Sequence, residues 1–124
     1  MSNTNVAIIG SNGFIGRHLA NLLLQKSFIN LHLFGRSNKS IFNKNVIYNQ
    51  IDLLDNQQNS VYFKDIDIVY YLASETIPAN SWANPLVDIE KNLTPFLIFA
   101  ECLSKLSIKK IVYLSQFDYK LHFY

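Results

Sequence analysis

The chain has 124 residues, 49% of them hydrophobic, and a formal net charge of only +2. That length suits a single domain, and lysines spread along the chain without a basic stripe give no reason to expect a nucleic acid partner. The apolar runs are shorter than the roughly 20 residues of a membrane span, and the first residues lack a signal-peptide pattern. The single cysteine, Cys102, excludes an internal disulfide and favours a reducing, cytoplasmic compartment.

The first half of the chain alternates predicted strands and helices. Residues 6–10 form a short apolar run that ends in glycine, which is typical of a strand buried on both faces. Apolar residues at helical spacing follow in residues 14–26. Two further strands are predicted at 31–35 and 46–51, and a short helix or loop at 55–64.

The second half begins with a clear apolar strand at 66–73 and a proline-containing loop. Residues 86–106 then predict a long amphipathic helix, in which Pro95 introduces a kink near the start. A fifth strand is predicted at 110–115. Six apolar side chains of the long helix are expected to face the core: Ile89, Leu93, Phe96, Leu97, Ala100 and Leu103.

This alternation predicts an α/β fold with a doubly wound parallel sheet, because right-handed crossovers place helices on both faces. The expected strand order is 3-2-1-4-5, as in a Rossmann fold. Residues 1–115 are expected to form this domain. Residues 116–124 are aromatic without a clear period and are expected to be an irregular tail.

A glycine-rich segment joins the first strand to the first helix, which is the context that gives such a motif meaning. In Gly10-Ser-Asn-Gly13-Phe-Ile-Gly16, the first glycine permits a tight turn, the second lets a pyrophosphate approach the backbone, and the third allows close helix packing. Helix amides then bind the phosphates, and Ser11 and Asn12 can add side-chain donors. An ordinary strand–turn–helix connection is the alternative. A nucleoside-triphosphate loop is not expected, because no Lys-Ser/Thr pair follows Gly16.

The glycine spacing resembles that of the short-chain dehydrogenase/reductases. The Gly-Phe-Ile-Gly element resembles the extended branch, the NAD-dependent epimerase/dehydratase family, which includes UDP-glucose 4-epimerases. The likeness covers residues 6–115 and only the N-terminal part of the family's pattern. It implies a dinucleotide cofactor, NAD or NADP, bound by Gly10, Ser11, Asn12, Gly13, Phe14, Ile15 and Gly16, and a nucleotide-sugar substrate in the full-length family.

The resemblance also implies which residues meet the adenosine. Family members read the ribose after the second strand, where NAD-preferring members carry an acidic residue. This chain has Gly35, Arg36 and Ser37 there. Loss of the carboxylate and gain of a guanidinium favour a 2′-phosphate and hence NADP. The alternative is that Arg36 is a solvated loop residue.

Three further segments match the family in order. Asp52 and Leu53 resemble its pair beside the adenine, and Leu72, Ala73 and Ser74 resemble the segment that passes the cofactor. Asn92 matches a family asparagine near the active site, although a capping or surface role is a rival interpretation. All these residues are candidate cofactor contacts.

The family's proton-transfer pair is absent from the 124 residues, because no tyrosine is followed four positions later by a lysine. Phe117 stands where the family places a catalytic hydroxyl, and the family's C-terminal substrate domain is expected to be absent. The chain alone is therefore expected to be inactive, with no catalytic residue. The alternatives are a non-catalytic NAD(P)-binding sensor or interaction module, and a decayed product. Its three histidines lack metal-ligand spacing, so no metal is expected, while a homo-oligomer stays open.

Overall fold

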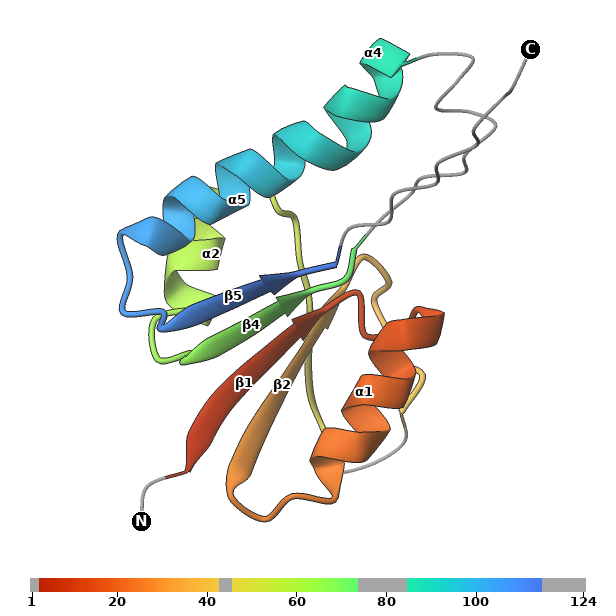
Figure 1. The fold of residues 1–124 in the computed structure, drawn as a ribbon, viewed down its shortest axis with the longest axis vertical. Helices are drawn as coiled ribbons and strands as arrows, with labels where there is room; N and C mark the ends of the chain where they lie inside the picture. The colour runs from red at the N-terminus through yellow and green to blue at the C-terminus, as the bar shows by residue number, and fades with distance from the viewer. Residues whose placement is uncertain (1–2, 43–45, 74–84, 115–124) are drawn as a thin grey trace, which may run out of the picture.

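A parallel sheet of five strands forms the centre of the fold, in the order β3-β2-β1-β4-β5 (Figure 1). The computed structural model describes residues 3–42, 46–73 and 85–114, except for the side chains of Asp88 and Asn92. The predicted doubly wound order is confirmed. The strands are β1 (Thr4–Ile9), β2 (Ile29–Gly35), β3 (Ile47–Gln50), β4 (Ile68–Tyr71) and β5 (Lys110–Tyr113).

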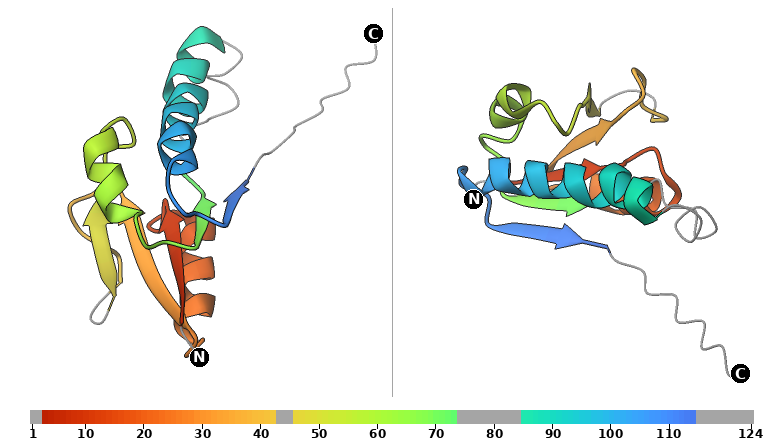
Figure 2. Two further views of the ribbon diagram at one scale, coloured as in Figure 1. Left: turned by 90° about the vertical axis from the view of Figure 1, so that its left-hand side faces the viewer. Right: turned by 90° about the horizontal axis from the view of Figure 1, so that it is seen from above.

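Helices cover both faces of the sheet (Figure 2). On one face lies α1 (Phe14–Leu24), and on the other lie α2 (Asn56–Tyr62) and α5 (Thr94–Ser104). Two shorter elements, α4 (Pro85–Asp88) and the π-helical η1 (Ile89–Leu93), lead into α5. In the described part of the chain, no helix has the length and apolar character needed to cross a membrane.

The two cores follow the alternation of side chains along the strands. Val6 and Ile8 of β1 pack with Ala20 on the α1 side, whereas Ala7 and Ile9 face α2 and α5. Every one of these β1 side chains is at most 2% exposed. β1 is therefore buried on both faces, as its continuous apolar run predicts.

Aromatic rings dominate the core beneath α2 and α5. The centroid of Phe63 lies 4.6 Å from that of Phe34 and 5.0 Å from that of Phe99, and Phe99 lies 5.9 Å from Tyr71. Such pairs each contribute about 0.5–1.5 kcal/mol beyond their buried area. The cluster joins β2, α2, β4 and α5, so it holds the strands that end at the site described below.

The prediction of which side chains of the long helix face the core is wrong in part. Ile89, Leu93 and Leu97 are 44–55% exposed, whereas Phe99, which the periodicity did not place in the core, is buried. Leu103 is buried as predicted, and Phe96 packs against the core. The segment is apolar on more than one side, so its pattern does not select a face. Contact with α2 makes that selection.

The predicted disturbance at Pro95 takes the form of a π-helical turn. η1 ends two residues before this proline. Pro95 has no N–H to donate to the carbonyl of Lys91, and its ring crowds that oxygen. The helix widens over this turn before α5 continues, which is a common way to absorb such a conflict.

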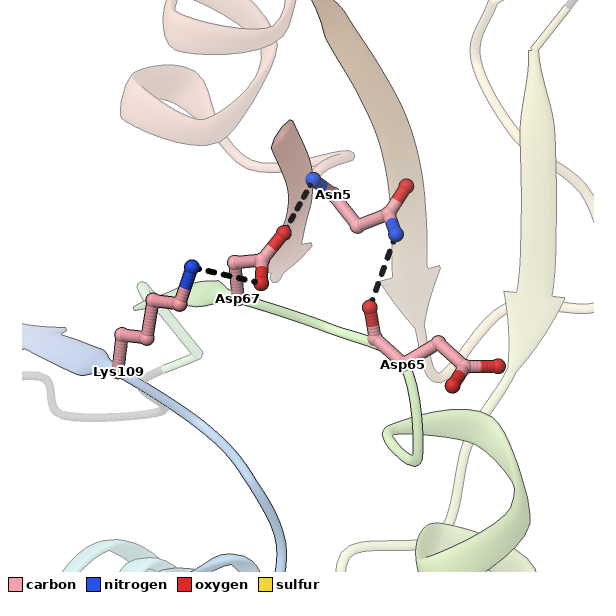
Figure 3. Close-up of polar contacts among 4 residues, drawn as sticks. All are labelled: Asn5, Asp65, Asp67 and Lys109. Carbon is pink, nitrogen blue, oxygen red and sulfur yellow. Dashed lines mark hydrogen bonds and ion pairs between the residues drawn. The ribbon is translucent and has the colours of Figure 1, made fainter. Parts of the chain in front are cut away.

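The amino ends of β1, β4 and β5 are joined by polar contacts around Asp67 (Figure 3). The Asp67 carboxylate accepts a hydrogen bond from the Asn5 amide at 2.8 Å, and the Asp67 amide donates to the Asn5 carbonyl at 2.8 Å. Lys109 Nζ lies 3.5 Å from the same carboxylate. The Asn5 side chain also donates to the carbonyl of Asp65 at 2.9 Å. These contacts set the strand register at the edge opposite the carboxyl ends.

Candidate functional site

A crevice of about 700 Å³ opens at the carboxyl ends of β1, β2 and β4. This is where open parallel sheets bind their ligands, at the point where the strand order reverses. The volume lies within the range of small-molecule and cofactor sites. The lining residues are Ile9, Gly10, Asn12, Gly13, Gly35, Arg36, Ser37, Ile51, Asp52, Leu53, Leu54, Tyr71, Leu72, Ala73, Lys91 and Pro95.

The turn after β1 requires glycine at position 10. Gly10 has a φ of 89°, a left-handed conformation that side chains disfavour. A Cβ there would lie 2.9 Å from the amide nitrogen of Ala73. The Gly10 amide donates to the carbonyl of Phe34 at 2.9 Å, which ties the turn to the end of β2.

The other two glycines of the segment differ in what surrounds them. A Cβ on Gly16 would stand 2.1 Å from the carbonyl oxygen of Gly10, so the first turn of α1 rests directly on the β1 turn. A Cβ on Gly13 would meet nothing closer than the same oxygen, at 3.4 Å. Gly13 lines the crevice, so the protein itself tolerates a side chain there and only the crevice loses space.

The first turn of α1 begins at Gly13, which lines the crevice. Gly13 is the N-cap, no described side chain caps the helix, and its first turn has no acidic residue. The partial positive charge of the helix end is therefore not neutralised by the described residues nearby. This arrangement suits an anionic ligand.

Ser11 and Asn12 use their side chains within the protein. Ser11 is fully buried, and its hydroxyl lies 3.5 Å from the Phe34 carbonyl, to which it donates. The Asn12 amide donates to the carbonyl of Lys39 at 3.0 Å and accepts from the amide of Ile41 at 3.1 Å. This geometry differs from the expectation that both offer side-chain donors to a phosphate. They hold the segment after β2 against the glycine turn instead.

Several predicted contacts lie away from the crevice. Phe14 and Ile15 are 71% and 51% exposed and do not line it, and Gly16 is buried beneath the turn. Asn92 belongs to η1, but its side chain is not among those described. Ser74 lies outside the described residues.

The end of β2 is held by side chains from β3. Gly35 is buried, while Arg36 and Ser37 are exposed and line the crevice. The Gln50 side chain donates to the carbonyl of Arg36 at 2.8 Å, and the Tyr48 hydroxyl donates to the carbonyl of Ser37 at 2.8 Å. Two predicted ribose contacts therefore sit on an anchored backbone.

Asp52 and Leu53 line the crevice beyond β3. The Asp52 carboxylate accepts from the amide of Leu54 at 3.0 Å, which leaves further acceptor capacity on its oxygens. Asn59 of α2 is fully buried and donates to the carbonyls of Asp52 and Leu53 at 3.3 and 3.1 Å. Asn59 thus supports this wall of the crevice from below.

Basic side chains outnumber acidic ones among the residues that line the crevice. Arg36 and Lys91 stand against the single carboxylate of Asp52 among the lining residues. Burial, followed by the neighbouring Tyr113, raises the pKa of Tyr71 to about 12. Tyr71 therefore keeps its proton at neutral pH and is not a base there. In the described ranges, no three side chains of His, Cys, Asp or Glu are grouped as a metal ion would need.

The family of the chain follows from comparison with known proteins. The model of the NAD-dependent epimerase/dehydratase family matches residues 6–116. The chain belongs to this family. UDP-glucose 4-epimerase of Bacillus subtilis is 31% identical over 121 residues, and the match covers 89% of this chain and 36% of the relative.

Solved structures of family members share the fold. UDP-glucose 4-epimerase from Bifidobacterium longum, in complex with NAD+ and UDP, is similar with a TM-score of 0.76 and 26% identity. That match covers 90% of this chain and 37% of the neighbour. UDP-glucose 4-epimerase from Stenotrophomonas maltophila, with bound NAD and formylated UDP-arabinopyranose, gives a TM-score of 0.77 at 19% identity. That match covers 90% of this chain and 36% of the neighbour. The chain spans little more than a third of these relatives' length.

Ten residues predicted for this family member's cofactor site line the crevice together, and six lining residues were not predicted. Ile51 and Tyr71 directly precede the predicted pairs Asp52–Leu53 and Leu72–Ala73, so their place in the chain was a usable signal. Lys91 and Pro95 reach the crevice from the helical segment, and no sequence signal placed them there. The predicted residues that line the crevice are Gly10, Asn12, Gly13, Gly35, Arg36, Ser37, Asp52, Leu53, Leu72 and Ala73.

Proposed function

We propose that this chain binds NAD or NADP in the crevice and is the cofactor-binding part of a nucleotide-sugar epimerase/dehydratase-like oxidoreductase. Residues 1–115 form the dinucleotide domain in this proposal. The observation that carries it is the glycine turn at the carboxyl end of β1: Gly10 has a positive φ, and Gly13 leaves open space beside uncapped helix amides. A diphosphate is the ligand chemistry that this combination suits.

The rest of the crevice suits the two ends of a dinucleotide. The pyrophosphate lies at Gly13, and the adenosine extends over the end of β2 toward Asp52 and Leu53. The other half extends past Leu72 and Ala73, with Ser74 and Asn92 as proposed contacts. Membership of an NAD-dependent family supports this placement.

The end of β2 supports a preference for NADP. Gly35 brings no carboxylate to repel a 2′-phosphate, and Arg36 lines the crevice. The epimerases of B. longum and S. maltophila were solved with NAD, so this preference is a feature proposed for this chain alone.

Catalysis is not expected from the chain by itself. No Tyr-x-x-x-Lys pair occurs in its sequence, and the tyrosine at the crevice, Tyr71, has a pKa of about 12. A lone cysteine supports a reducing, cytoplasmic setting. A non-catalytic NAD(P)-binding sensor or interaction module is the second candidate. The exposed apolar residues Leu86, Leu93 and Leu97 along one helical segment favour it, because they offer a contact surface for a partner or a second copy.

The proposal is tested by calorimetric titration of the 124-residue chain with NAD and NADP, next to a turnover assay with UDP-glucose. We expect saturable binding of a dinucleotide and no turnover. Absence of binding for both dinucleotides in a protein with a cooperative thermal melt would refute the proposed function.

A further inference from the structure

We propose that Tyr48 is a specificity-determining residue: its hydroxyl fills the side-chain space of position 35, excludes a carboxylate from the end of β2 and holds the backbone that meets a 2′-phosphate. The inference rests on the proposed dinucleotide function and names which dinucleotide the site prefers, NADP with its 2′-phosphate or NAD without it. It assigns that choice to a residue of β3 that does not line the crevice.

The space argument begins with strand register. Tyr48 pairs with Leu33 across β2 and β3. Leu33 and Gly35 are two residues apart and lie on the same face, so the Tyr48 ring extends along β2 toward Gly35. A Cβ built on Gly35 would stand 2.6 Å from the Tyr48 hydroxyl oxygen and 3.4 Å from ring carbon Cζ. Any side chain at position 35 must displace that hydroxyl.

The hydroxyl is not free to move without a loss. It donates to the carbonyl of Ser37 at 2.8 Å. Burial raises the pKa of the Tyr48 phenol above 10, against a smaller opposing effect of its hydrogen bond with Asn12. Tyr48 therefore stays a protonated donor across the neutral range. Displacing it releases the Ser37 carbonyl from its anchor.

The anchored segment faces the ligand. Arg36 and Ser37 both line the crevice, and Gln50 holds the carbonyl of Arg36 in the same way that Tyr48 holds that of Ser37. With glycine at position 35, the end of β2 offers the cation of Arg36 and no carboxylate. A phosphate on the ribose gains from this arrangement, whereas a free 2′-hydroxyl lacks the acceptor that NAD sites usually provide.

The test is a double-mutant cycle between positions 35 and 48, with NADP and NAD titrated separately by calorimetry. Tyr48→Phe removes the hydroxyl and should weaken the affinity for NADP about fivefold, which corresponds to one hydrogen bond of about 1 kcal/mol. NAD affinity should change by less than about twofold. Gly35→Ala should weaken NADP similarly in the native background and should add no loss to Tyr48→Phe, because both changes break the same bond.

A second pair reports on specificity itself. Gly35→Asp alone should weaken the affinity for NADP without raising the affinity for NAD, because its Cβ displaces the Tyr48 hydroxyl. Gly35→Asp together with Tyr48→Phe should bind NAD at least about fivefold tighter than Gly35→Asp alone, since the nearest ring carbon then lies at 3.4 Å. Tyr70→Phe, a partly buried tyrosine that packs on the same face, is the matched control and should leave both affinities unchanged.

The outcomes separate this inference from the proposed function. If neither dinucleotide binds the native chain, the proposed function fails and Tyr48 has no role in it. If a dinucleotide binds but the effects of Gly35→Ala and Tyr48→Phe simply add, the role of Tyr48 is overturned while the binding function stands. Should Gly35→Asp fail to fold, the alanine cycle decides the question by itself.

Discussion

The sharpest prediction concerns two glycines three residues apart that should fail in opposite ways when substituted. Gly13 has φ −75° and ψ 173°, which any residue adopts, and a Cβ there meets nothing closer than 3.4 Å. Gly13→Val should therefore cost only about 0.5–1 kcal/mol in the free energy of unfolding, because valine is a poorer N-cap residue than glycine but meets no clash. Its methyl groups project into the crevice and keep a diphosphate off the helix amides.

The binding loss can be sized from the contacts removed. Two hydrogen bonds from backbone amides to a charged phosphate contribute about 1.5–3 kcal/mol each. Losing both weakens the dinucleotide by at least about 3 kcal/mol, or roughly two orders of magnitude in Kd. Calorimetric titration with NADP and NAD measures this loss, and thermal unfolding of the same samples reports the small change in stability.

Gly16→Ala is the matched control. Its Cβ would stand 2.1 Å from the Gly10 oxygen, so backbone must move and the fold should lose about 1–3 kcal/mol or more. That loss lowers Tm by on the order of 4 °C per kcal/mol in a domain of this size. The reasoning is refuted if Gly13→Val keeps its dinucleotide affinity within threefold, or if Gly16→Ala melts at the native temperature.

Four further predictions concern stability away from the crevice. Asp67→Ala should lower the free energy of unfolding in urea by about 1.5–3 kcal/mol, because it removes the charged acceptor of the Asn5 amide. Dinucleotide affinity should stay unchanged. An unaltered urea midpoint would contradict the prediction. Lys109→Ala should cost nearly nothing, since that side chain is 77% exposed. Phe99→Ala should cost about 3–5 kcal/mol, because the ring is fully buried between other aromatic rings; a loss below 1 kcal/mol would show that the core is not as described. Burial lowers the pKa of His32 below 6.5, so the unfolded chain takes up a proton at a higher pH than the folded chain does. The free energy of unfolding should therefore fall as the pH drops through 6.5. His32→Gln should flatten that pH dependence in urea titrations at about pH 5 to 7.5, and an equal slope in both proteins would count against the prediction.

Much of the fold could be predicted because its signals are local. Residues 6–9 of the predicted apolar run are buried in the structure, with side chains on both faces of the sheet, and the alternation of strands and helices indicated the observed strand order. Gly10 is required by its own backbone conformation and Gly16 by the nearby carbonyl oxygen of Gly10, so their spacing in the sequence already carried the information. Helix and strand periods depend on the chain's own geometry, which short windows of sequence reflect.

Tertiary contacts decided what the patterns left open. The side of residues 86–106 that became buried depended on α2 lying against it, because the segment is apolar on several sides. The side chains of Ser11 and Asn12 found partners 23 to 29 residues away, which tied the glycine turn to the end of β2 and the segment after it. Tyr48 came to occupy the space beside Gly35 only because β2 and β3 pair in one register. The sequence by itself determined where strands, helices and the glycine turn form, because these depend on neighbours along the chain. The partners of each polar and apolar side chain were decided by the tertiary structure, because they depend on which distant segments of the chain pack together.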